Sequence, residues 1–151
     1  MRIKRLHFFA FCLCIVTGCT HSKSSVKSDL IVKIKDNHLV NKLEYGEIIY
    51  KSKTLDTLKL SEDDTRYLWF HFGIFNSPKT ITELEKYNLN SYKSINDSVV
   101  PFESKFDAEG IYYLEGYLEE VILLDHYYNS ADMREINKKI KISKKILYSE
   151  K

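Results

Sequence analysis

RYLWFHFGIFN, at residues 66–76, alternates two sets of mostly large side chains with a period of two. One set consists of Leu68, Phe70, Phe72 and Ile74. The other consists of Tyr67, Trp69, His71 and Phe75. A β-strand places alternate residues on opposite faces, whereas a helix would not gather either set on one side. The segment therefore predicts a strand with one face in a core, and Asn76-Ser77-Pro78 ends it.

Short apolar runs separated by turn residues continue this pattern toward the N-terminus. Residues 30–35 alternate apolar and polar side chains, and residues 45–51 and 57–60 are further runs of strand length. Residues 80–87 are ambiguous, because Thr80 and Glu83 have the spacing of a helical capping box over only about two turns. We expect residues 88–98 to form a polar loop.

The C-terminal segment allows two interpretations. Its apolar residues share one parity and predict a last strand that pairs back across a turn at residues 128–132; they are Ile136, Ile140, Ile142, Ile146 and Tyr148. The same residues also cover about half of a helical wheel, with Ser130 as a possible N-cap. A basic amphipathic helix over residues 130–151, lying on anionic lipid, is therefore the alternative. The repeated isoleucines favour the strand.

A glycine and a tyrosine stand at the start of another predicted strand, in the stretch FDAEGIYYLEG at residues 106–116. Gly110 precedes Tyr112 by two positions, after an acidic turn, and this pattern resembles the tyrosine corner of immunoglobulin-like and fibronectin-type sandwiches. The resemblance implies that the Tyr112 hydroxyl bonds to nearby backbone while the ring packs inward. Gly116 within the strand indicates a bulge or a close approach of another backbone. We expect an all-β, mainly antiparallel fold of the immunoglobulin-like β-sandwich type.

The N-terminus has the layout of an export signal. Three basic residues precede an apolar run at residues 6–16, which is too short to span a bilayer. Val16-Thr17-Gly18-Cys19 then resembles the lipobox of bacterial lipoproteins. The resemblance implies a diacylglycerol on the Cys19 thiol and removal of residues 1–18, signal helix included, on maturation. Thr20, in place of an aspartate, favours an outer-membrane location.

These assignments divide the chain into a signal peptide at residues 1–18, a lipidated cysteine with a polar tether at residues 19–28, and one sandwich domain at residues 29–151. Removing the signal takes away three basic residues and no acidic one, so 23 basic and 21 acidic residues become 20 and 21. A net charge near −1 gives no basic face for nucleic acid. The membrane, reached through the lipid on Cys19, is the expected partner, and no nucleic-acid partner is expected.

The mature sequence contains no recognisable catalytic or metal-binding motif. Its one cysteine is lipidated, so thiol catalysis, disulfides and thiolate metal sites are excluded, and no histidine has a neighbour at metal-ligand spacing. Asp125-His126 resembles half of a triad, but no nucleophile elbow accompanies it. Glu119 and Glu120 are neighbours that would point to opposite faces, and we expect both to be solvated. We predict no enzyme activity, no cofactor and no metal; a hydrolase with Asp64, Glu119 and Asp125 gathered by folding is the alternative.

Five aromatic residues are predicted to face outward from the two strongest strands: Tyr67, Trp69, Phe75, Tyr113 and Tyr117. Clustered exposed aromatics mark protein or glycan partner sites. The alternative is that the tether, a loop or the last strand covers them. The expected function is a non-enzymatic cell-envelope lipoprotein that presents a binding or structural surface. The second hypothesis is an inhibitor or immunity lipoprotein that neutralises a hydrolase or toxin.

Overall fold

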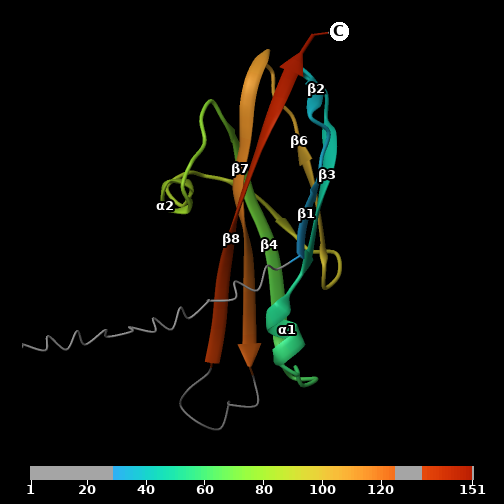
Figure 1. Ribbon diagram of the computed structural model, residues 1–151, viewed down its shortest axis with the longest axis vertical. Helices are drawn as coiled ribbons and strands as arrows, with labels where there is room; N and C mark the ends of the chain where they lie inside the picture. The colour runs from blue at the N-terminus through green and yellow to red at the C-terminus, as the bar shows by residue number, and fades with distance from the viewer. Residues whose placement is uncertain (1–28, 125–133, 151) are drawn as a thin grey trace, which may run out of the picture.

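The chain folds into two packed β-sheets in a computed structural model that describes residues 29–124 and 134–150 (Figure 1). The three-stranded sheet has the order β1–β3–β6 and the five-stranded sheet has the order β2–β8–β7–β4–β5. Neighbouring strands are antiparallel, apart from the parallel pair of β2 and β8. The all-β, mainly antiparallel sandwich predicted from the sequence is confirmed.

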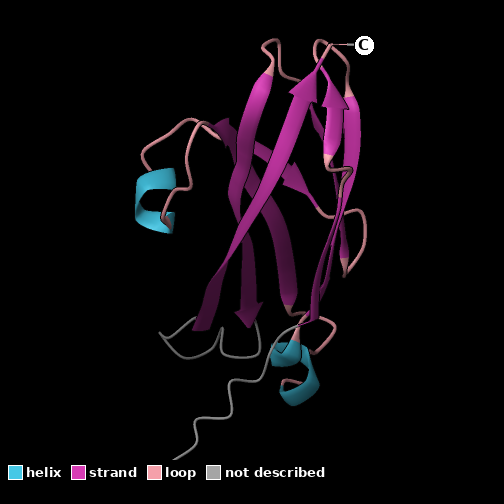
Figure 2. Cartoon of the chain, turned by 45° about the horizontal axis from the view of Figure 1, so that its top comes forward, coloured by secondary structure: helices cyan, strands magenta, loops and turns pink. Residues whose placement is uncertain are grey.

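The strands are β1 (Asp29–Lys33), β2 (Asn37–Leu39), β3 (Glu44–Lys51), β4 (Thr65–Phe75), β5 (Asn90–Lys93), β6 (Val99–Ser104), β7 (Gly110–Leu124) and β8 (Arg134–Ser149). Two short helices, α1 (Lys53–Thr57) and α2 (Ile81–Leu84), lie outside the two layers, α1 at one end of the sandwich and α2 beside the five-stranded sheet (Figure 2). The long hairpin of β7 and β8 forms the centre of the larger sheet (Figure 1).

The core lies between the inward faces of the two sheets. The predicted inward set of β4 supplies Leu68, Phe70 and Phe72, all almost fully buried. Phe70 and Phe72 each contact Phe102 of β6 edge to face, with ring centroids 5.1 and 5.2 Å apart. Such pairs add to the stabilisation that area burial alone provides. The period-two interpretation of residues 66–76 is therefore confirmed.

The C-terminal segment is strand β8, so the amphipathic-helix alternative is wrong. Ile142, Ile146 and Tyr148 are buried in the core. β8 pairs with β7 from Arg134 to Tyr148. The backbone N–H and C=O groups of β8 that face β7 are therefore hydrogen-bonded to that strand. The proposed N-cap, Ser130, lies outside the described residues.

Two predictions of local structure are wrong. Residues 57–60 were expected to form a strand, but helix α1 ends at Thr57 and the next three residues belong to no element. Residues 90–93 were expected to lie in a polar loop, but they form the edge strand β5. An edge strand needs little apolar character because one side of it stays in solvent. Residues 81–84 are helical, and Thr80 and Glu83 form the reciprocal capping box.

The start of β7 has the contacts expected of a tyrosine corner. The Tyr112 hydroxyl donates a hydrogen bond to the backbone oxygen of Glu109 at 3.2 Å. Its ring packs against Phe106, with centroids 4.3 Å apart, and lies against the core. Gly110 has φ of +136°, a conformation that L side chains rarely adopt. The backbone conformation at position 110 therefore explains why a glycine stands two positions before Tyr112.

Gly116 marks a close backbone approach, as its position within a strand predicted. A Cβ atom there would lie 2.3 Å from the backbone oxygen of His71 on the paired strand β4. The predicted signal peptide, Cys19 and the tether lie outside the described residues. Within residues 29–124 and 134–150, no helix is long and apolar enough to cross a membrane.

Candidate binding surface

The five aromatic residues singled out in the sequence lie on the outer face of the five-stranded sheet. Tyr67, Trp69 and Phe75 alternate with the core residues of β4, and Tyr113 and Tyr117 alternate with those of β7. Because β4 and β7 pair in antiparallel register, His71 stands opposite Tyr117 and Phe75 stands opposite Tyr113. The sheet geometry thus brings the two predicted aromatic rows onto one surface.

Three of these residues, together with His71, form one continuous group. The Trp69 and His71 rings stack with centroids 6.4 Å apart, and the His71 and Tyr117 rings lie 5.0 Å apart. The ammonium of Lys93, on β5, lies 5.3 Å from the centre of the Tyr67 ring and 5.9 Å from that of Trp69. We call Tyr67, Trp69, His71 and Tyr117 the aromatic face.

The other two residues are separated from the aromatic face. A row formed by Gly73 and the buried Glu115 lies between them and Tyr117 along the strands. The Phe75 ring packs against Tyr87, with centroids 5.0 Å apart. The structure therefore does not join Phe75 and Tyr113 to the same group.

The connection between β4 and β5, residues 76–89, covers part of the outer face. Leu84 of α2 is fully buried, although it does not belong to the core between the sheets. The backbone N–H of Lys79 donates to a carboxylate oxygen of Glu115 at 3.2 Å. Tyr117 is only 8% exposed. The alternative that a loop covers the aromatics thus holds for one end of the face, while Tyr67 and Trp69 are partly exposed.

Charged groups border the aromatic face. Lys139 of β8 lies 5.2 Å from the centre of the Tyr117 ring and forms an ion pair with Glu85 at 2.7 Å. The hydrogen bond to Glu85 raises the pKa of Lys139, and burial raises the pKa of Tyr117. Both groups therefore keep their protons at neutral pH, so a positive charge lies beside the Tyr117 ring at this border of the aromatic face.

His71 is held by polar neighbours on both adjoining strands. Its Nδ1 lies 2.7 Å from the Ser91 hydroxyl. Its Nε2 lies 3.3 Å from Oε2 of Glu119, at an angle that makes no hydrogen bond. Glu119 in turn accepts a hydrogen bond from Asn137 at 3.1 Å. These contacts hold the His71 ring in its place within the aromatic face.

Sequence reasoning missed three buried carboxylates among the described residues: Glu44 at the start of β3, and Glu115 and Glu120 of β7. Glu115, on the outer side of β7, is fully buried and accepts hydrogen bonds from Lys141, Ser143 and the backbone of Lys79. No alternation pattern identifies it, because the segment that buries it comes from a different part of the chain. The one sequence feature that could have indicated its burial is that Lys141 and Ser143, on the strand that pairs with β7, can donate hydrogen bonds to it.

Glu120 lies between the sheets, so the expectation that it is solvated is wrong. Its carboxylate accepts hydrogen bonds from Tyr50 at 3.0 Å, Ser52 at 2.9 Å and Arg66 at 2.7 Å. Lys138 donates to the Tyr50 hydroxyl at 3.3 Å. These contacts join β3 of one sheet to β4, β7 and β8 of the other. A buried carboxylate persists as an ion only with such partners, and here it links the two layers.

Ser91, His71 and Glu119 are the serine, histidine and carboxylate that lie in contact on the outer face, but Nε2 of His71 makes no hydrogen bond to Glu119. Glu119 and Glu120 point to opposite sides of the sheet, as their adjacency predicted. Asp125 and His126, the half-triad of the sequence, lie outside the described residues. Within residues 29–124 and 134–150, no group of three or more His, Cys, Asp or Glu side chains is placed to hold a metal ion.

Comparison with known proteins gives no relative for this chain. No family model, no curated protein and no solved structure matches it.

Proposed function

We propose that this chain is a non-enzymatic lipoprotein of the bacterial cell envelope that binds a macromolecular partner through its aromatic face. The lipobox pattern at residues 16–19 supports the lipid anchor on Cys19, and Thr20 supports the outer membrane. The sandwich then begins ten residues after the anchor, so the lipid would hold the domain close to a bilayer.

The strand order supports an immunoglobulin-like arrangement of the sandwich. β3 and β6 correspond to strands B and E, and β4, β7 and β8 correspond to C, F and G, with β5 as C′. The tyrosine-corner contact of Tyr112 falls at the start of β7, the strand that corresponds to F. Proteins of this architecture bind partners through sheet faces as well as loops, and they need no catalytic residue to do so.

The observation that carries the binding proposal is the position of Trp69. It is the only tryptophan of the chain, and it lies on the outer face of a central strand instead of in the core. Lys93 and Tyr67 lie beside it. Trp and Tyr supply large contact areas at a small cost in side-chain entropy, and they dominate the energetics of protein interfaces.

Site-specific photocrosslinking in intact envelopes tests the proposal. A photoreactive residue at position 69 or 67 should capture a macromolecule, whereas the same residue at Lys59, which is exposed in the segment before β4, should not. The class of the captured molecule separates a structural or binding role from the neutralisation of a hydrolase or toxin. Capture of lipid alone at positions 67 and 69 would exclude binding through this face.

A further inference from the structure

The outer face of the three-stranded sheet carries exposed apolar side chains beside charged ones. The side chains that point away from the core are Asp29, Ile31 and Lys33 of β1, Tyr45, Glu47, Ile49 and Lys51 of β3, and Val99, Pro101 and Glu103 of β6. Ile31 is 52% exposed and Tyr45 is 72% exposed. The solvent side of an antiparallel sheet is usually polar, so this apolar content indicates an interaction surface.

The register of β1 and β3 arranges this face in matched rows. Ile31 pairs with Ile49, and Lys33 pairs with Glu47. The Lys33 ammonium lies 3.6 Å from the Glu47 carboxylate, and both side chains are more than half exposed. An exposed pair of this kind contributes little to stability, so each charge can exchange its partner at low cost.

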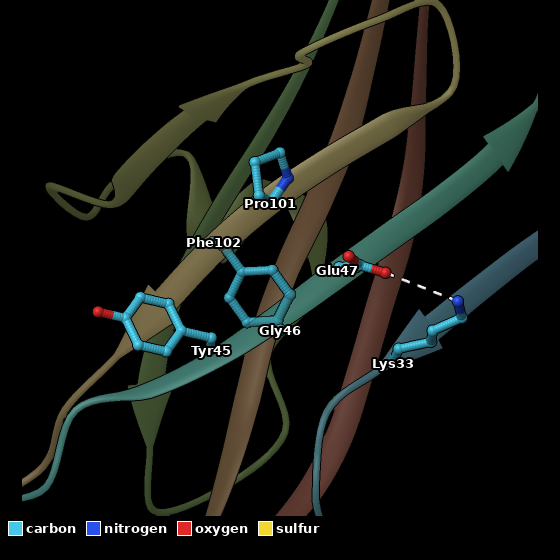
Figure 3. Close-up of a pocket in the computed structure, with 6 residues that line it drawn as sticks. All are labelled: Lys33, Tyr45, Gly46, Glu47, Pro101 and Phe102. Carbon is cyan, nitrogen blue, oxygen red and sulfur yellow. Dashed lines mark ion pairs between the residues drawn. The ribbon is translucent and has the colours of Figure 1, made fainter.

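The face also has a hollow next to this ion pair. Lys33, Tyr45, Gly46, Glu47, Pro101 and Phe102 line an open pocket of about 320 Å³ (Figure 3). Glu47 lies between Lys33 and Pro101, and the ring of Tyr45 lies to one side of them (Figure 3). A cationic side chain entering the hollow would therefore meet the Glu47 carboxylate.

We propose that two copies of this chain pack face to face through this surface, related by a two-fold axis that runs along the strands above the line between β1 and β3. Rotation about this axis exchanges the positions of β1 and β3. Lys33 of each copy then faces Glu47 of the second copy, and Ile31 faces Ile49. Two sheets stack about 10 Å apart, a gap that these side chains span.

Charge favours this axis over one that runs above β3. An axis above β3 would place Glu47 against its own copy, and like charges in an interface cost several kcal/mol. Addition of a strand to the edge of the sheet is disfavoured at β6, because Pro101 lacks a backbone N–H. A face-to-face pair with Lys33 opposite Glu47 avoids both penalties.

The same axis keeps both copies in one orientation. Because it runs along the strands, the two Asp29 residues at the start of β1 lie at the same end of the pair. Two chains held on one membrane require this arrangement, and this step alone rests on the proposed lipid anchor. A face of three short strands is small for a stable dimer, so the pair should be weak in dilute solution.

Sedimentation of the full chain, extracted in a density-matched detergent under reducing conditions, tests the proposal. The wild-type chain should show a concentration-dependent monomer–dimer equilibrium. Lys33→Glu should weaken dimerisation at least about tenfold, because it sets two carboxylates against each other. The double variant Lys33→Glu/Glu47→Lys restores the opposite charges and should recover the wild-type affinity. Lys59→Glu makes the same change outside the face and should leave the equilibrium unchanged.

The proposal is overturned if the wild-type chain stays monomeric at every concentration, or if Lys33→Glu and Lys59→Glu behave alike. It is also overturned if the double variant is as weak as the single one while circular dichroism shows all variants folded. Intact-mass measurement of the same samples reports lipidation of Cys19 separately. A dimer without lipid would refute the anchor and leave the interface intact.

Discussion

Truncation of Glu120 to alanine should destabilise the sandwich strongly, because this carboxylate is the acceptor for a buried network that joins the sheets. Its side chain is almost fully buried, and so is that of its ion-pair partner Arg66. The substitution removes the acceptor for the Tyr50 and Ser52 hydroxyls and for the guanidinium at once. Breaking a buried pair from one side costs about 3–5 kcal/mol, chiefly because a buried charge loses its counterion.

Urea unfolding followed by Trp69 fluorescence measures this change. Domains of this size have unfolding free energies of about 5–15 kcal/mol, so Glu120→Ala should remain folded with a much lower midpoint. Glu119→Ala is the matched control, because this neighbour lies on the opposite side of the sheet and is partly exposed. It should change the free energy of unfolding by less than about 1 kcal/mol.

A double-mutant cycle isolates the charge pair from the remaining hydrogen bonds. Arg66→Met/Glu120→Met removes both ions and replaces them with apolar side chains, so its loss of stability should be smaller than the sum of the two single losses. The coupling between positions 66 and 120 should exceed about 1 kcal/mol. Equal effects of Glu119→Ala and Glu120→Ala, or a cycle with no coupling, would show that Glu120 is not an ionised link between the sheets.

Three further measurements follow from the fold. Gly116→Ala should destabilise the domain by at least about 1–3 kcal/mol in urea, because its Cβ would meet the backbone oxygen of His71 at 2.3 Å; a neutral effect would contradict the close packing of β4 and β7. Tyr112→Phe should lose about 0.5–1.5 kcal/mol with its hydrogen bond to backbone, whereas Tyr113→Phe, which breaks no such bond within residues 29–124 and 134–150, should lose less. Burial raises the pKa of Tyr117, so its folded-state stabilisation is complete below the unfolded value of 10.0 and is lost as pH rises through the folded pKa. Stability should therefore fall in this alkaline range, and Tyr117→Phe should reduce the slope; an unchanged slope would place the effect elsewhere.

The sequence predicted best where a pattern acts through the backbone alone. The alternation in residues 66–76, the shared parity of the C-terminal isoleucines and the capping box of Thr80 and Glu83 each reflect local geometry, and the structure contains all three. The sequence predicted poorly where contacts with distant segments determine the secondary structure. Residues 90–93 become a strand because β4 offers a free edge, and no local propensity in that polar segment announces it.

Burial of charge was the least predictable property for the same reason. Glu119 and Glu120 are chemically identical neighbours, yet one borders the outer surface and the other lies in the core beside Arg66. Because they are adjacent in a strand, the sequence predicted that their side chains point to opposite faces of the sheet. Only the position of the second sheet, which brings Tyr50 and Ser52 over the inner side, decides which of them is buried. Polar residues at inward positions were therefore wrongly expected in solvent.

The core residues and the outward aromatic residues of β4 alternate along one backbone, so the packing of the core affects how the aromatic face binds a partner. Phe70 lies in the core and stands between Trp69 and His71 in the chain, so its packing fixes the backbone from which these two outward side chains project. Gly116 allows β7 to approach β4 at this level, which brings Tyr117 within ring contact of His71. A surface set by a rigid core loses little entropy when it binds. Gly116→Ala should therefore weaken binding by displacing the backbone of His71, although it changes no side chain of the aromatic face.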